Sequence, residues 1–293
     1  MRQFRLSLVL CALLFIARPA WADPHPGTKL LKLEGDITSQ LVDGVDRFLL
    51  RQLADSIDKR AAHWKRDLSS PQAYVKSVAA NRARLAEITG VVDERATVED
   101  IDAIQVIVKG GNPFVAAGGR FRTTNIRWRS VRNLHGEGLM LQPGNRTTTS
   151  LVIVIPDADQ TPEMLCGLSE GLPPEQQYAR RLVESGCRVF VPSIISRHYE
   201  ARNGRAKMTS REFAYRSAYE LGRHLIGYEV QKILAAVDLF EQLSRRRLKP
   251  LPIGVAGIGE GGLLSLYAAA LDPRIDATLV CGYFERRDAL WRE

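Results

Sequence analysis

The sequence has 293 residues, of which 45% are hydrophobic and 25% are charged. This balance is typical of a soluble globular protein, and it excludes a collagen-like chain, a wholly disordered chain and a bundle of membrane helices. The net charge of +8 comes from 41 Lys and Arg against 33 Asp and Glu, which are spread along a sequence without a nucleic-acid-binding motif. We therefore expect one large domain, or one domain with a small companion, and no nucleic-acid partner.

The first 22 residues have the pattern of a secretory signal peptide. Arg2 and Arg5 form a positive start, residues 6–17 form an apolar stretch, and Ala20-Trp21-Ala22 is a small-x-small cleavage site. The apolar stretch is too short to span a bilayer comfortably. A buried core helix would leave the charges and the cleavage site unexplained. We therefore expect an exported protein, periplasmic or extracellular, that is not held in a membrane after cleavage.

Three cysteines remain once the signal, with Cys11, is removed: Cys166, Cys187 and Cys281. An odd number at irregular spacing is not a disulfide framework, although one bridge would be compatible with it. Cys187 and Cys281 lie at the edges of apolar strand-like stretches, which favours buried free thiols. The sequence contains no Cys-x-x-Cys pair and no His-x-x-x-His spacing. We therefore predict no metal site.

Residues 23–100 are predicted to form a helical N-terminal segment. Apolar residues three and four apart over residues 36–57 indicate one amphipathic helix. Ser70 and Pro71 provide an N-cap and a first-turn proline for a second helix, which ends at Gly90. Neither helix can bury its apolar face alone, so we expect both to pack on the rest of the protein.

Residues 101–293 are predicted to form an α/β domain. Residues 124–131 alternate in polarity as a half-buried strand does, and residues 138–142 are predicted as its hairpin partner. Residues 151–155 are all apolar and mostly β-branched. Such a run predicts a strand in the middle of a sheet that helices cover on both faces.

Strands and helices then alternate along the chain. Further strands are predicted at residues 188–192, 253–256 and 277–284, and helices at residues 174–185, 219–243 and 262–271. The charged residues 193–217 show little periodicity and are expected to form an inserted surface loop. The basic residues 245–247 complement the carbonyl end of the long helix, which accounts for them without nucleic acid. The alternation predicts an α/β fold with a mostly parallel sheet flanked by helices.

A glycine-rich turn from strand to helix, residues 253–262, carries the main chemical signal. Gly257, Gly259 and Gly262 match the dinucleotide fingerprint G-x-G-x-x-G. That fingerprint normally opens a fold and is followed by an acid about 20 residues later, whereas this turn comes late and the nearest such acid is Glu285. Gly257, Gly261 and Gly262 also suit the nucleophile elbow, G-x-S-x-G, in which small residues let a strand and a helix cross closely. The late position favours the elbow, and we predict no cofactor.

The turn and its surroundings resemble the α/β-hydrolase superfamily, in particular exported bacterial proteins of the dienelactone hydrolase and acetyl xylan esterase type. The resemblance covers residues 120–293, and residues 71–90, which contain Asn81-Arg82-Ala83-Arg84-Leu85, look like the lead-in helix of such proteins. The resemblance rests on the elbow, on residues 151–160 before it, on residues 222–229 and 234–238 of the long helix, and on residues 268–275 after the elbow. It implies an α/β-hydrolase fold and hydrolysis of carboxylic esters through a covalent acyl-enzyme, with acetylated sugars or plant polymers among the substrates.

One position departs from the family pattern. Gly259 stands where the family carries a nucleophilic Ser, Cys or Asp, and glycine has no side chain that could attack. Either the next residue, Glu260, serves as a displaced carboxylate nucleophile, or the elbow has no nucleophile. In the family the acid and the histidine follow the elbow, whereas all five histidines of this sequence precede it. We therefore expect an incomplete hydrolase fold that lacks the C-terminal strands with the acid and the base.

The resemblance also implies the place of an oxyanion hole. The N–H of Glu260 and an N–H of Asp157 or Ala158 would hold the oxyanion. Asp157, Asp159 and Glu260 should share one crevice, because the carboxyl ends of parallel strands meet at the same edge of a sheet. The run from Pro156 to Asp159 also has ordinary turn chemistry, so a purely structural turn remains open.

Three other polar residues are candidates near that crevice. His198 lies in the inserted stretch and is the candidate general base. For His224, on the helix before the elbow strand, we expect a structural hydrogen bond. Glu285, at the end of the last strand, would face the crevice or the solvent.

Two functions therefore remain. The first is an exported carboxylic-ester hydrolase, which the resemblance favours. The second is a non-catalytic binding or interaction protein that retains the hydrolase fold, a pseudoenzyme, which Gly259 favours.

Overall fold

The computed structural model describes residues 25–96, 104–105, 116–117, 120–144, 147–201, 207–245 and 249–284. The predicted signal peptide and Glu285 lie outside these residues, so the expected export stays a prediction. The contacts within the chain divide it into two compact units, Met1–Ile57 and Asp58–Glu293.

A long helix, α2 (Ile37–Ala61), begins in the smaller unit and confirms the helix predicted from the apolar spacing. None of its residues is buried, and the apolar side chains of Leu41, Val45, Phe48 and Ile57 are exposed. Among the described residues, no helix is both long and apolar enough to cross a bilayer.

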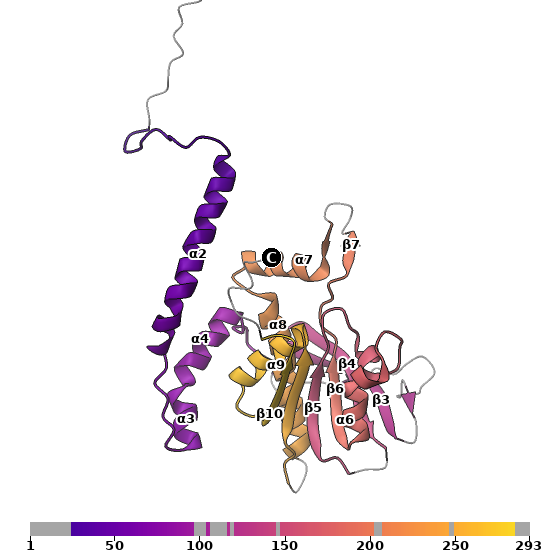
Figure 1. Cartoon of the computed structure of the whole chain (residues 1–293). Coiled ribbons are helices and arrows are strands. Elements are labelled where there is room, and N and C mark those ends of the chain that lie inside the picture. The colour runs from indigo at the N-terminus through magenta and orange to yellow at the C-terminus, as the bar shows by residue number, and fades with distance from the viewer. Residues whose placement is uncertain are drawn as a thin grey trace, which may run out of the picture. The chain divides into compact units, whose positions relative to one another are not determined.

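A mixed sheet forms the centre of the larger unit (Figure 1). Its strand order is β1-β3-β4-β6-β5-β9-β10, with β2 paired to β3. The pairs that join β6, β5, β9 and β10 are parallel, and the other pairs are antiparallel. The strands are β1 (Ile104–Gln105), β2 (Ala116–Ala117), β3 (Phe121–Val131), β4 (Leu134–Pro143), β5 (Ser150–Ile155), β6 (Cys187–Pro192), β9 (Ile253–Ile258) and β10 (Ala277–Cys281).

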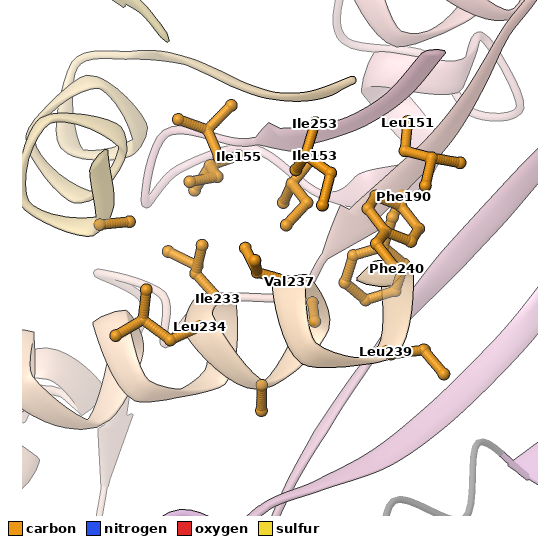
Figure 2. Close-up of a cluster of buried hydrophobic side chains, with 14 of the residues drawn as sticks. Leu151, Ile153, Ile155, Phe190, Ile233, Leu234, Val237, Leu239, Phe240 and Ile253 are labelled. Carbon is orange, nitrogen blue, oxygen red and sulfur yellow. The ribbon is translucent and has the colours of Figure 1, made fainter. Parts of the chain in front are cut away.

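Helices cover both faces of this sheet. One face packs on α5 (Pro162–Cys166) and α6 (Tyr178–Glu184), with the short helix η2 (Pro174–Gln176) between them. The other face packs on α8 (Leu225–Arg245) and α9 (Glu260–Leu271). Figure 2 shows Leu151, Ile153 and Ile155 of β5 together with Ile233, Val237 and Phe240 of α8 in one buried cluster. The expected α/β fold is therefore confirmed, with β5 inside the sheet as its apolar run predicts.

The helix expected over residues 71–90 is present as two pieces, α3 (Pro71–Ser77) and α4 (Ala79–Thr89). The Ser70 hydroxyl accepts the Ala73 N–H at 3.1 Å, and Gly90 ends α4 with φ at +76°. Arg82 donates to the Ala270 carbonyl of α9 at 3.0 Å. This helix pair therefore packs on the sheet-bearing unit, as expected for the second helix.

The segment between β6 and α8 differs most from its prediction. Instead of a loop it contains a small hairpin, β7 (Tyr199–Ala201) with β8 (Lys207–Thr209), and a helix, α7 (Ser210–Glu220). The long helix expected from residue 219 begins only at Leu225, because Gly222 takes φ +66° and separates α7 from α8. Weak periodicity hid these elements, since they bury few apolar side chains.

The three described cysteines are free, so the bridge that was left open does not form. The expectation of buried thiols is wrong for two of them. Cys187 is only half-buried and Cys281 is exposed. Cys281 is exposed because β10 ends the sheet order and most of its residues face solvent, whereas Cys187 is the first residue of β6, a strand whose burial is complete only from Val189 onward.

Candidate functional site

The turn between β9 and α9 has the geometry of a strained elbow. Gly259 forms its apex with φ +58° and ψ −122°, a backbone conformation that favours glycine. A Cβ added to Gly257 would lie 2.1 Å from the Gly261 carbonyl oxygen, and one added to Gly261 would lie 2.2 Å from the Ile155 carbonyl oxygen. These close backbone approaches explain why the turn needs small residues.

The carboxylate of Asp157 fills the space in front of this apex. Asp157 lies two residues after the end of β5, and its Oδ1 accepts the Glu260 N–H at 2.8 Å. A Cβ on Gly259 would lie only 2.7 Å from the same oxygen. The Asp157 N–H in turn donates to Gln160 Oε1 at 3.3 Å. Two of the N–H groups expected to form the oxyanion hole are therefore bonded to acceptors within the chain.

Two arginines from the segment after β6 bring the acidic residues together. Arg197 Nη1 lies 2.9 Å from Asp159 Oδ2 and 3.4 Å from Asp157 Oδ2, and its Nη2 lies 3.3 Å from Glu260 Oε2. Arg211 Nη2 forms an ion pair with the other oxygen of Glu260. The structure therefore places Asp157, Asp159 and Glu260 around one guanidinium at the carboxyl ends of β5 and β9.

The charges at this cluster stabilise one another. Burial lowers the pKa of Arg197, but the hydrogen bond that it donates to Asp159 and the charges of Asp157, Asp159 and Glu260 raise this pKa by more, so that the net shift is upward. Arg211 is the less exposed of the two arginines, with 11% of its side chain accessible against 41% for Arg197. Paired guanidinium and carboxylate groups at this depth are held by charge-assisted hydrogen bonds.

The other candidate residues lie around this cluster in different roles. The run from Pro156 to Asp159 is also a turn, because the Gln160 N–H donates to the Asp157 carbonyl at 3.0 Å. Ala158 is buried, and its carbonyl accepts the Arg197 N–H at 3.3 Å.

His198 follows Arg197 but has an exposed side chain. Its described hydrogen bonds come from the backbone, since its N–H donates to Ser196 Oγ and its carbonyl accepts the Ser210 N–H. These contacts shape the segment around Arg197, and the role of His198 as general base stays a prediction.

His224 makes the structural hydrogen bond that was expected. Its Nδ1 accepts the Ile226 N–H at 3.0 Å at the start of α8. Burial and the positive charge of Arg211 lower its pKa, and the nearby charge of Glu260 opposes them. The ring also contacts Tyr215 edge-on, with the centroids 5.1 Å apart.

Sequence reasoning missed both arginines of the cluster. Residues 193–217 contain Arg197, Arg202, Arg205, Arg211 and Arg216, and no local pattern distinguishes one from another. The available signal was indirect. Three carboxylates expected at one sheet edge require a cation nearby, and this stretch is the nearest source of cations after β6.

In the described part of the chain no three His, Cys, Asp or Glu side chains form a group that could hold a metal ion. The helix N–H that would face a pyrophosphate, that of Glu260, is bonded to a carboxylate of the chain itself.

Solved structures of other proteins share this fold. No family model and no curated protein sequence matches this chain. A solved structure from Bacteroides fragilis, assigned as an acetyl xylan esterase, superposes with a TM-score of 0.50 at 18% identity, over 74% of this chain and 55% of that one. The chain has an α/β-hydrolase-like fold. It spans little more than half the length of that esterase.

Two further acetyl xylan esterase structures are similar at lower scores. The one from Thermoanaerobacterium has a TM-score of 0.44 at 14% identity and covers 73% of this chain and 61% of its own. The one from Paenibacillus has a TM-score of 0.43 at 15% identity and covers 83% of this chain and 68% of its own.

Proposed function

We propose that this chain is a non-catalytic protein with an α/β-hydrolase-like fold, which serves in binding or interaction and does not hydrolyse esters at its elbow. The observation that carries the proposal is the position of Asp157. Its Oδ1 accepts the Glu260 N–H at 2.8 Å and stands where a side chain on Gly259 would begin. One internal carboxylate thus fills both the nucleophile position and half of the oxyanion hole.

Ester hydrolysis requires the opposite electrostatics at this point. The tetrahedral intermediate carries a negative oxygen that backbone N–H groups must face. In this chain that oxygen would meet the negative charge of Asp157 instead, and the Glu260 N–H would first have to leave its present acceptor. The arrangement therefore disfavours the transition state for acyl transfer.

Glu260 is also poorly suited to act as a displaced nucleophile. One of its carboxylate oxygens pairs with Arg211 and the other with Arg197. Only 19% of its side chain is accessible. A nucleophilic carboxylate needs a free oxygen directed at the substrate, and ion pairing of both oxygens lowers their reactivity.

The proposal is tested with the purified chain and a short-chain aryl ester. We expect turnover at the rate of the buffer alone for the wild type, for Glu260→Gln and for Asp157→Ala, because neither substitution provides a nucleophile at position 259. Release of the aryl alcohol is followed by absorbance. Turnover by the wild type that Glu260→Gln abolishes would show that Glu260 is a nucleophile and would overturn the proposal. The exposed variant Glu212→Gln controls for unrelated effects of losing a carboxylate.

A further inference from the structure

The segment between β6 and α8 approaches the elbow from outside the sheet. We call residues 193–201 and 207–224, which include β7, β8 and α7, the strap segment. Figure 1 shows β7 and α7 beyond one end of β5 and β6.

Both ends of the strap segment are fixed to the body of the unit. At its start, Lys232 donates to the Ser193 carbonyl at 3.0 Å and the Ile195 N–H donates to Glu229 Oε1 at 2.8 Å. The Glu229 side chain is only 1% accessible, so this anchor is buried. At its end, Arg223 Nη2 and Nε bind Asp93 with distances of 2.8 to 3.1 Å.

Between these ends the strap segment has little apolar packing. Helix α7 buries only Arg211 and Ala218. The side chains of Tyr199, Tyr219 and Leu221 are exposed. Apolar burial, the main source of stability for a helix on a protein surface, is therefore small along this segment.

Ion pairs of Arg197 and Arg211 with the carboxylates of Asp157, Asp159 and Glu260 replace that packing. Arg211 binds Glu260 through Nη2 and the Ile195 carbonyl through Nη1 at 2.9 Å. It therefore connects α7 both to the first residues of the strap segment and to the elbow. Arg197, in the arm of the strap segment that precedes β7, pairs with the second oxygen of Glu260. This arm and the arm that follows β8, with Arg211, thus meet at the first residue of α9.

We propose that the strap segment is a closure over the elbow, which the ion pairs of Arg197 and Arg211 with Asp157, Asp159 and Glu260 hold shut. Its fixed ends let β7, β8 and α7 lift together when the two arginines release these carboxylates, which uncovers the turn around Gly259. This inference is independent of whether the elbow catalyses any reaction. It concerns the conformational equilibrium of the segment, and residues 193–201 and 207–224 should open more readily than the sheet to which they are attached.

Hydrogen exchange of the full chain, followed by mass spectrometry at neutral pH, tests the closure. In Glu260→Gln the side chain keeps its size but loses its charge, and charge-assisted hydrogen bonds of this kind contribute enough that their loss raises opening about tenfold. We expect amides in residues 210–220, where Arg211 loses its carboxylate, to exchange about tenfold faster than in the wild type. The rise over residues 196–201 should be smaller, because Arg197 keeps its ion pairs with Asp157 and Asp159. Peptides from β5 and β9 should be unchanged.

Two further variants make the outcome decisive. Glu212→Gln removes a carboxylate that pairs with Arg216 at 2.7 Å on the exposed surface of α7, so exchange of the strap segment should stay as in the wild type. Arg197→Gln removes one arm only, and faster exchange should be confined to residues 196–201. Unchanged exchange in Glu260→Gln overturns the proposal, because the ion pairs would then not control opening of the strap segment. Exchange that rises equally in β5 and β9 also overturns it, because the substitution would then destabilise the whole fold.

Discussion

Gly259 meets two constraints at once. Its φ of +58° lies in the region where a Cβ is unfavourable, and the Asp157 carboxylate occupies the space beside it. The elbow can hold this carboxylate only because position 259 has no side chain. The hydrogen bond from the Glu260 N–H to Asp157 Oδ1 therefore depends directly on the glycine that stands in place of the nucleophile.

Gly259→Ala should destabilise the protein strongly. The new Cβ would lie 2.7 Å from Asp157 Oδ1 on a strained backbone, so we expect the free energy of unfolding in urea to fall by at least about 2 kcal/mol. Gly254→Ala is the matched control, since a Cβ in β9 would meet its neighbours at ordinary distances of 3.6 to 3.9 Å and should change stability by less than about 1 kcal/mol. Equal effects of the two substitutions would refute the role assigned to the elbow backbone.

Helix α8 begins with a cap whose acceptor, the His224 ring, can titrate. His224 caps this helix through Nδ1 and needs its neutral form to accept the Ile226 N–H. Arg211 of α7 and Glu260 of α9 are the charged groups that act on the ring, and burial together with Arg211 lowers its pKa. The cap therefore lies at the junction between the strap segment, α8 and the elbow.

Acid should weaken the fold through His224. The unfolded chain binds a proton near the ordinary pKa of about 6.5, whereas the folded protein binds it only at lower pH, so the free energy of unfolding should decrease as the pH falls below about 6.5. Urea unfolding at pH 7.5 and pH 5 measures this decrease. His224→Asn keeps a capping acceptor without a titrating ring and should show a smaller decrease. The exposed His135→Asn should keep the wild-type profile, and a wild-type profile in His224→Asn would contradict the assignment.

Two long helices of the molecule differ sharply in burial. Helix α8 buries 14 of its 21 residues, whereas α2, with 25 residues, buries none. An isolated helix of this length is only marginally stable in water, because most helical stability in proteins comes from packing. Helix α2 therefore gains little stability from packing against the described part of the chain.

Hydrogen exchange should reveal this difference directly. We expect the amides of α2 to exchange at least about a thousandfold faster than those of α8, since local opening of α2 exposes no apolar surface that was buried. Mass spectrometry of the intact chain compares the two helices in one sample. Protection of α2 comparable to that of α8, especially if it falls on dilution, would mean that a second copy or another partner covers its apolar side chains.

The sequence by itself determined the elements whose signals are local. Five consecutive apolar residues gave a strand inside the sheet, and Ser70, Pro71 and Gly90 marked a helix that the structure has with one interruption at Val78. The glycines at 257, 261 and 262 identified the elbow because close backbone crossing leaves no room for a Cβ. The rule that strand ends meet also placed Asp157, Asp159 and Glu260 at one edge of the sheet.

The tertiary structure decided what those residues do. Asp157 and Glu260 are 103 positions apart, and only the parallel pairing of β5 with β9 brings the carboxylate of one to the N–H of the other. Which arginines of the strap segment form the cluster likewise depends on the path of that segment past the carboxyl ends of β5 and β9, where Arg197 and Arg211 meet the carboxylates. Ion pairs between distant residues leave no periodicity in a sequence, because they need only two side chains to meet, whereas a buried helix or strand needs a repeated apolar pattern.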